Sequence, residues 1–186
     1  MIPRVTEILA LHPSRRYMAG SPERMAEGRE VHRLIAAGMQ TDSVLQPWLD
    51  SWFSACRDLR IELLQCEFEV RYKAQEIEYV GHPDCLAYVG GEPALVEIKT
   101  GGKNHSDKLQ LIAYWFAQEC KVRRRFIIYL RPDAKPPYSI DEIMASEVPL
   151  LWLEFLQLYQ LWQDYQEVAN TWLPTGEISI QIGGEL

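Results

Sequence analysis

The chain has 186 residues, of which 47% are hydrophobic and 24% are charged, and its formal net charge at pH 7 is −7. This composition is typical of a globular protein and excludes a disordered or collagen-like chain. The length predicts a single domain over residues 1–186. No apolar run approaches the roughly 20 residues of a membrane span, and the first residues carry no export signal. We therefore expect a cytoplasmic protein without membrane partners.

The cysteines and the charge exclude further classes of protein. No CxxC or other close spacing occurs among Cys56, Cys66, Cys85 and Cys120. Without an export signal, this pattern predicts buried reduced thiols, and neither a cysteine-bound zinc nor an iron–sulfur cluster is expected. The negative net charge argues against nucleic-acid binding, because phosphate contacts normally supply most of the affinity.

Two helices are predicted first in the chain. Ser21 and Pro22 are a typical N-cap and N1 pair, and Gly38 ends the segment 21–38. Apolar residues recur at helical spacing in this segment, so His32 is expected to face inward. A second helix is predicted over residues 44–64 with a single apolar stripe, and its tryptophans are expected to serve packing.

Strands follow the two helices. The segment 66–74 alternates apolar and charged residues, which is typical of a half-exposed strand. Residues 77–89 predict one or two strands broken near Gly81 and Pro83. Gly90-Gly91 predicts a hairpin turn into a partner strand over residues 93–99.

The helical period returns over residues 106–119, and a strand is predicted next over residues 123–132. Three prolines in residues 132–139 predict a loop. An amphipathic helix is expected over about residues 149–172, and the tail after it is a candidate edge strand or partner contact. This order of elements predicts an α/β sandwich.

Three charged residues, Asp84, Glu97 and Lys99, interrupt stretches that otherwise predict buried strands. Glu97 and Lys99 project to the same side of one strand while Ile98 points into the core, and the tight turn lets Asp84 lie across from Glu97. Two converging carboxylates repel unless a cation or a proton joins them, and hard oxygen ligands suit Mg²⁺ or Mn²⁺. A metal ion, an oriented water and a cationic stabiliser together can hydrolyse a phosphodiester.

Asp84 followed by Glu97-Ile98-Lys99 resembles the PD-(D/E)xK motif of the restriction-endonuclease-like nucleases, and Pro83-Asp84 keeps its first two letters. Further segments are similar to the RecB-like and phage-type exonuclease branch: GREVH (28–32), KTG (99–101) and QLIAY (110–114). The opening PRVTEIL (3–9) is also similar to the start of many phage-type and mitochondrial single-strand exonucleases. The resemblance covers about residues 3–130.

The resemblance implies an α/β fold with a restriction-endonuclease-like core, a mixed central β-sheet flanked by helices in αβββαβ order. This core would span about residues 20–130, with extra N-terminal and C-terminal helices. One or two Mg²⁺ or Mn²⁺ ions would be bound by His32, Asp84, Glu97 and the backbone carbonyl of Ile98. No iron–sulfur cluster is carried over, because the four-cysteine pattern of some relatives is missing.

The resemblance also implies roles for residues around the metal. Lys99 would position or activate water. Gln110 and Tyr114, at i and i+4 on one helical face, would support the site and touch the DNA backbone. Either Glu67 or Glu69, on the preceding strand, could orient a ligand from outside the metal's own shell.

The implied function is a divalent-metal-dependent DNA exonuclease acting in DNA repair, recombination or phage DNA processing and leaving a 5′-phosphate. Two alternatives stay open: a structure- or sequence-specific endonuclease, and a non-catalytic DNA-binding or assembly subunit that retains the nuclease fold. The expected partner is DNA, single- or double-stranded, with free ends. A second copy of the chain or separate repair and recombination proteins are candidate further partners.

Each candidate residue also has an ordinary structural explanation. His32 could be a core histidine, and Asp84 could start a turn. Glu97 and Lys99 could form a solvated strand face, and Gln110 could belong to the polar shoulder of an amphipathic helix together with Tyr114.

Basic residues near the predicted site are candidate DNA contacts: Lys103, Lys108, Arg123 and Arg125. Arg123 and Arg125 are expected to share a strand face, where they could instead protect a sheet edge. The remaining histidines, His12, His82 and His105, are expected at the surface. Two bound Mg²⁺ would move the net charge from −7 to about −3 at the place where phosphate must bind.

Overall fold

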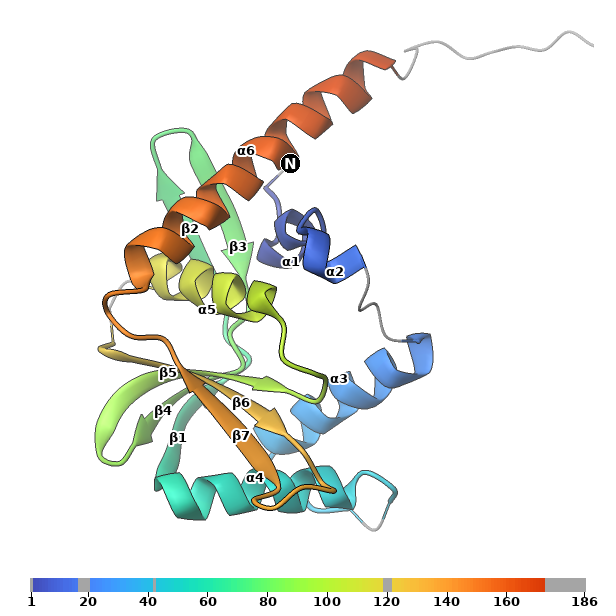
Figure 1. Cartoon of the computed structure of the whole chain (residues 1–186), viewed down its shortest axis with the longest axis vertical. Helices are drawn as coiled ribbons and strands as arrows, with labels where there is room; N and C mark the ends of the chain where they lie inside the picture. The colour runs from blue at the N-terminus through green and yellow to red at the C-terminus, as the bar shows by residue number, and fades with distance from the viewer. Residues whose placement is uncertain (1, 17–20, 42, 119–121, 173–186) are drawn as a thin grey trace, which may run out of the picture.

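The protein was studied as a computed structural model, which describes residues 2–16, 21–41, 43–118 and 122–172. Its centre is a five-stranded sheet in the order β1-β4-β5-β6-β7, and a separate two-stranded ribbon consists of β2 and β3 (Figure 1). The strands are β1 (Ile61–Cys66), β2 (Val70–Ala74), β3 (Ile77–Gly81), β4 (Cys85–Val89), β5 (Glu92–Lys99), β6 (Arg124–Leu130) and β7 (Tyr138–Glu142). The helices are α1 (Val5–Leu9), α2 (Pro13–Arg16), α3 (Pro22–Ala36), α4 (Gln46–Leu59), α5 (His105–Ala117) and α6 (Val148–Trp172).

The sheet is mixed. β5 and β6 run parallel, and the other neighbouring strands are antiparallel. Parallel neighbours need a crossover connection, which α5 supplies. In chain order α4, β1, β4, β5, α5 and β6 reproduce the expected αβββαβ core, with the β2–β3 ribbon inserted after β1 and β7 added at the sheet edge. The predicted fold class is therefore confirmed.

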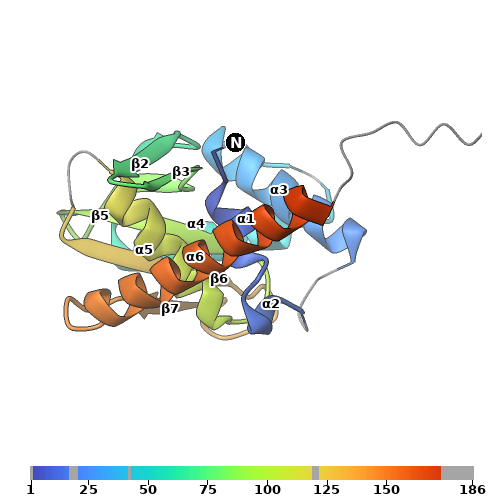
Figure 2. The ribbon, with the colours of Figure 1, turned by 90° about the horizontal axis from the view of Figure 1, so that it is seen from above.

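Helices cover both faces of the sheet. α1, α5 and α6 pack with the β2–β3 ribbon on one face, and α3 and α4 cover the other. Figure 2 shows α6 crossing the layer that contains α5. β5 serves both cores, because Leu95 faces α5 and α6 whereas Val96 and Ile98 face α3 and α4. Side chains of β5 that point toward α5 therefore lie between the sheet and this helix.

Several predicted boundaries hold. α3 begins after Ser21, whose hydroxyl accepts the backbone N–H of Arg24. Gly90 and Gly91 have φ values of 63° and 87° in the hairpin between β4 and β5, a conformation that glycine adopts without a Cβ clash. α6 agrees with the predicted last helix. The tail after Trp172, a candidate edge strand, lies outside the described residues.

Three predictions about local structure were wrong in part. The second helix ends at Leu59 rather than at residue 64, because Arg60 takes a left-handed φ of 51° and the next residues pair with β4. The strand predicted over residues 66–74 is broken at Glu67, whose φ is 49°, so that Cys66 ends β1 and Val70 begins β2. The predicted loop over residues 132–139 also overlaps the start of β7, which the sequence pattern missed.

Among the described residues, no helix combines the length and apolar character needed to cross a membrane.

Candidate active site

Asp84 joins three elements. It lies directly before β4, and its side chain is 9% exposed. Asp84 Oδ1 is 2.9 Å from His32 Nδ1 on α3, and Asp84 Oδ2 accepts the backbone N–H of Ile98 on β5 at 2.7 Å. The carboxylate is therefore fixed between a helix and the strand that carries Glu97 and Lys99.

Glu97 on β5 is more deeply buried than Asp84, with only 2% of the residue exposed. Its Oε1 accepts hydrogen bonds from Lys99 Nζ and from Gln110 Nε2, each at 2.9 Å. Its Oε2 is buried and has no hydrogen-bond partner among the described residues. A buried carboxylate oxygen without a donor costs free energy, so this atom favours a cation beside it.

Gln110 organises the other side of the group. Its Oε1 accepts from Lys99 Nζ at 3.1 Å and from Arg15 Nη2 on α2 at 3.0 Å. Its Nε2 also donates to the hydroxyl of Tyr114, one turn further along α5, at 2.9 Å. We call His32, Asp84, Glu97, Lys99 and Gln110 the strand-end site. Arg15 was missed by the sequence analysis, since nothing in the pattern around it distinguishes it from other surface arginines.

The predicted DNA contacts of Gln110 and Tyr114 are not supported. Both side chains are buried, and each is engaged inside the protein. A Cβ at Gly81 would lie 2.3 Å from Tyr114 Cε1, so the missing side chain of Gly81 makes room for the tyrosine ring. Gln110 and Tyr114 therefore support the geometry of the site from within.

Gly28, the first residue of the GREVH segment, lies close to the end of β5. A Cβ at this position would lie 2.9 Å from Thr100 Oγ1, at the end of β5. The glycine therefore lets α3 approach the strand end closely. This approach brings His32, one turn further along α3, to Asp84.

Burial and neighbouring charges shift every titratable group of the site. Burial, and then the charge of Asp84, raises the pKa of Glu97 to about 7, and Lys99 offsets this only in part. Burial alone would raise the pKa of Asp84, but His32, Lys99 and the Ile98 N–H together lower it. Burial opposes the charged forms of His32 and Lys99, yet the adjacent carboxylates raise the pKa of both. Such opposed shifts are common at functional sites.

Two residues of this site and Glu67 beside it have the spacing of metal ligands. A ring nitrogen of His32 and carboxylate oxygens of Glu67 and Asp84 are all within 4.8 Å of one another. The φ of 49° at Glu67 turns the chain here, and its N–H donates to the Asp84 carbonyl at 3.0 Å. Glu69, the alternative in the sequence analysis, is exposed and lies 3.6 Å from His82. Of the two glutamates, only Glu67 is at the site.

These donors fit a hard divalent ion. Carboxylate oxygens suit Mg²⁺ and Mn²⁺, and Mn²⁺ also accepts imidazole. Glu97 is not a member of the 4.8 Å group, but its Oε2 is buried and has no partner in the part of the chain that the structure describes, so it is available to a cation. Ile98 contributes its N–H to Asp84, and metal binding by its carbonyl stays a prediction.

The basic residues that were predicted to contact DNA have other surroundings than expected. Lys103 pairs with Asp141, and Lys108 lies 2.8 Å from Glu147, so both bases are engaged in ion pairs. Arg123 is exposed but precedes β6.

The prediction that Arg125 contacts DNA was wrong. Only 5% of this residue is exposed. Its guanidinium donates to the Ile143 carbonyl and lies 4.9 Å from the Trp115 ring centroid. Burial against this ring and carbonyl removes the charge from the surface that a phosphate could reach.

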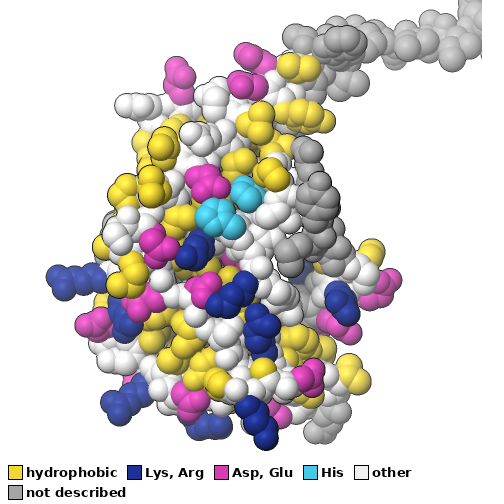
Figure 3. Space-filling model, in the orientation of Figure 1, with side chains coloured by type: hydrophobic (Ala, Val, Ile, Leu, Met, Phe, Trp, Pro, Cys, Tyr) yellow, Lys and Arg dark blue, Asp and Glu magenta, His cyan; other side chains and the backbone are white. Residues whose placement is uncertain are grey.

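A cleft of about 430 Å³ opens beside the end of β5. It is lined by Arg24, Trp48, residues 100–102 and residues 130–134. The charged residues of its lining are Arg24, Arg131 and Asp133, which give it one net positive charge, and the sequence had not indicated any of them. On the face shown in Figure 3, basic side chains lie among acidic ones, and histidine side chains lie together beside an acidic one.

The chain shows weak structural likeness to solved nucleases. An alkaline exonuclease, LHK-Exo from Laribacter hongkongensis, is 13% identical over 91% of this chain and 94% of that protein, with a TM-score of 0.44. The structure of LHK-Exo in complex with dAMP matches with 16% identity over 90% of this chain and 91% of that protein, with a TM-score of 0.42. The protein SSO0001 is 17% identical over 74% of this chain and has a TM-score of 0.40, and the match spans 61% of its length.

No protein-family model matches the sequence, and no curated protein matches it. Likenesses with TM-scores below 0.5 do not determine a function. The chemistry of the strand-end site therefore has to be inferred from its own atoms.

Proposed function

We propose that the chain is a divalent-metal-dependent deoxyribonuclease that hydrolyses phosphodiester bonds at the strand-end site. The observation that carries the proposal is the buried Oε2 of Glu97, which has no partner among the described residues, on a carboxylate whose other oxygen is held by Lys99 and Gln110. Buried polar atoms normally have a hydrogen-bond partner. The unpaired oxygen is therefore available to a metal ion.

Asp84, Glu97 and His32 would hold the ion, with Glu67 as a further ligand or as a support for one. When bound, a divalent ion supplies a Lewis acid for the scissile phosphate and lowers the pKa of a water. His32 and the Ile98 N–H orient the two oxygens of Asp84. This orientation is set by the folded chain before any substrate arrives.

Lys99 is the residue suited to act on the reacting atoms. Its Nζ is held by Glu97 and Gln110, and the side chain still reaches the surface. The neighbouring carboxylates raise the pKa of Lys99, so it stays cationic. A fixed ammonium at this point can hold the attacking water or stabilise the negative charge that develops on the phosphoryl oxygens.

The cleft beside β5 is a path for the DNA backbone, because Arg24 and Arg131 face the same strand end as the site. Lys103 and Lys108 would contact DNA only by exchanging their present carboxylate partners for phosphate. We favour an exonuclease that leaves a 5′-phosphate, in DNA repair, recombination or phage DNA processing, on the resemblance of the motifs.

Digestion of three DNA forms tests the proposal. Linear duplex, closed circular duplex and single-stranded DNA would each be incubated with the purified chain and Mg²⁺ or Mn²⁺, with a chelator-treated sample as control. Loss of only the forms with free ends indicates an exonuclease, and cutting of closed circles indicates an endonuclease. If no form is cut with either metal, the proposal fails and a non-catalytic subunit is favoured.

A further inference from the structure

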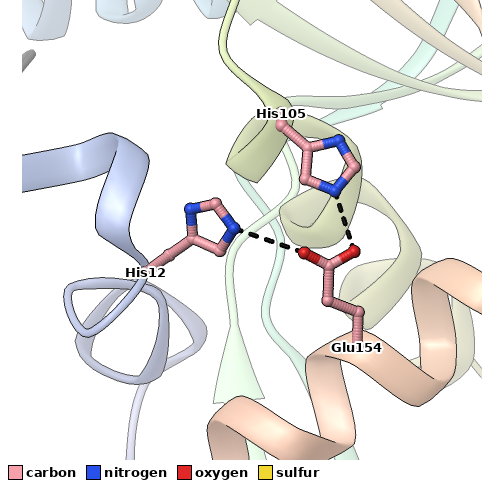
Figure 4. Close-up of side chains that lie close together, drawn as sticks. All are labelled: His12, His105 and Glu154. Carbon is pink, nitrogen blue, oxygen red and sulfur yellow. Dashed lines mark hydrogen bonds and ion pairs between the residues drawn. The ribbon is translucent and has the colours of Figure 1, made fainter.

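A second group of histidine and carboxylate side chains lies outside the strand-end site. His12 follows α1, His105 is the first residue of α5, and Glu154 is on α6 (Figure 4). His12 Nε2 is 3.3 Å from Glu154 Oε1, and His105 Nε2 is 2.8 Å from Glu154 Oε2. We call these three residues the histidine cluster. Three segments that are 49 or more positions apart in the chain thus bring these side chains together.

The spacing of the three ligand atoms matches a small tetrahedral ion. One ligand atom from each residue lies within 4.8 Å of the other two. Atoms bound to zinc at about 2.0–2.1 Å lie about 3.3–3.4 Å apart when the geometry is tetrahedral. The contact of His12 with Glu154 already has this length. The contact of His105 Nε2, which reaches the other Glu154 oxygen, is about 0.5 Å shorter and can adjust through the exposed His105 side chain.

Hydrogen bonds behind His12 hold its ring in place. His12 Nδ1 is 2.7 Å from Ser14 Oγ and 3.2 Å from the Ser14 backbone N–H, which donates to it. Ser14 Oγ in turn donates to Asn104 Oδ1 at 2.5 Å, and the same oxygen accepts the backbone N–H of Ser106 at 3.0 Å.

The held ring directs Nε2 toward Glu154 Oε1, at 3.3 Å. Contacts of the second ring nitrogen orient metal-binding histidines in many proteins. The position of the His12 ring is therefore set by the chain before any ion binds.

His105, in the first turn of α5, is open to solvent. The side chain is 48% exposed, so an ion can reach it from solvent. Neutral imidazole nitrogens with one carboxylate are typical ligands of zinc and of other late first-row metals, and they do not suit Mg²⁺.

We propose that the histidine cluster binds a zinc-class divalent ion through His12 Nε2, His105 Nε2 and a Glu154 oxygen, with water as the fourth ligand. The ion ties α6 to α5 and to the segment between α1 and α2. This site is separate from the nuclease proposal, since the two groups have no residue in common.

Thermal unfolding of the metal-stripped chain with added Zn²⁺ tests the proposal. At a Zn²⁺ concentration of about 100 Kd, the melting temperature of the wild-type chain should rise by about 5–10 °C. The rise should be lost in His105→Ala and in Glu154→Gln, whose side chains are partly exposed and therefore removable without loss of the fold. His82→Ala is the matched control, because this exposed histidine also faces a glutamate, at 3.6 Å, but belongs to another part of the chain.

The strand-end site could also take up zinc, so the informative quantity is the difference between the wild-type chain and the variants. A rise that is equal in wild type, His105→Ala and Glu154→Gln would overturn the proposal, as would the absence of any rise. A rise of the same size with Mg²⁺, again lost in His105→Ala, would overturn the assignment to a zinc-class ion. Retention of the rise in His82→Ala together with its loss in the other two variants would support the site.

Discussion

Two regions of this molecule pair histidine with carboxylate, and they do so in different surroundings. In the strand-end site the carboxylates lie on or beside strands of the central sheet and are buried. In the histidine cluster the groups come from helices and a connecting segment, and the glutamate and one histidine are partly exposed. Only the strand-end site contains a lysine, held at 2.9 Å from Glu97.

These differences in burial and charge bear on which region can catalyse a reaction. Burial and neighbouring charges shift the pKa values of the titratable groups in the strand-end site. Lys99 stays charged at the place where a phosphoryl group would gain negative charge. The histidine cluster has metal ligands but no lysine and no comparable shelter from water. We therefore expect catalysis at the first region and only metal binding at the second.

The largest effect is expected from Lys99→Ala. Removal of the fixed ammonium should lower the rate of DNA cleavage by about 10²–10³-fold, the cost of losing one group that stabilises transition-state charge. Single-turnover cleavage of labelled linear DNA measures it. Lys73→Ala is the control, since Lys73 is an exposed base on β2 that lies 3.5 Å from Glu78. Similar rates for both variants would assign Lys99 to the structure alone.

Gln110→Ala should lower cleavage less, by about 10–100-fold, because Gln110 positions Lys99 and Glu97 without touching the reacting atoms. Its effect should appear in kcat and in the metal concentration for half-maximal activity, while the affinity for DNA stays unchanged. Gln160→Ala is the matched control on α6, where Gln160 donates to the exposed Asp164. Unchanged metal dependence in Gln110→Ala would contradict this positioning role.

The pH dependence of metal affinity should follow Glu97. Its pKa is raised to about 7, so protons compete with the metal below that pH. The apparent affinity for Mn²⁺ should therefore rise about tenfold from pH 6 to pH 8. Without metal the sign is opposite: a carboxyl with a raised pKa stabilises the fold while protonated, and this contribution is lost as pH rises through about 7. A flat affinity over this range, measured by calorimetry, would contradict the assignment.

The smallest effect is expected at the cleft. Arg131→Ala should weaken DNA binding roughly threefold to tenfold and reduce the slope of affinity against salt by about 1, as for one lost phosphate contact. Arg71→Ala on β2 is the control, since Arg71 pairs with Glu78 away from the cleft. Fluorescence anisotropy at several salt concentrations, in the presence of chelator, measures both quantities. A slope equal to that of the wild-type chain would remove the cleft from the DNA path.

The sequence predicted the parts of the fold that local patterns determine. Alternation along β5 correctly placed Glu97 and Lys99 on one side and Ile98 in the core. The hairpin followed from Gly90-Gly91. The resemblance to the motif also indicated that Gln110 lies near Glu97 and Lys99, and the structure places it in hydrogen-bond contact with both.

What the sequence did not predict depends on tertiary contacts. Arg125 belongs to a run of three consecutive arginines, yet its guanidinium is buried against Trp115 because α5 packs there. The left-handed turn at Glu67 brings this residue to Asp84, and no glycine or asparagine marks it. The expectation that His12 lies at the surface missed that the ring is only 12% exposed and reaches Glu154 on the last helix.

Manganese binding tests the account most directly, with wild type, Asp84→Asn and His105→Ala titrated in parallel and bound Mn²⁺ followed by electron paramagnetic resonance. The account predicts uptake by wild type and by His105→Ala, and a loss of that uptake in Asp84→Asn while its melting temperature shows that it remains folded. No uptake by the wild-type chain, or equal uptake by Asp84→Asn, would contradict a metal centre at the end of β5.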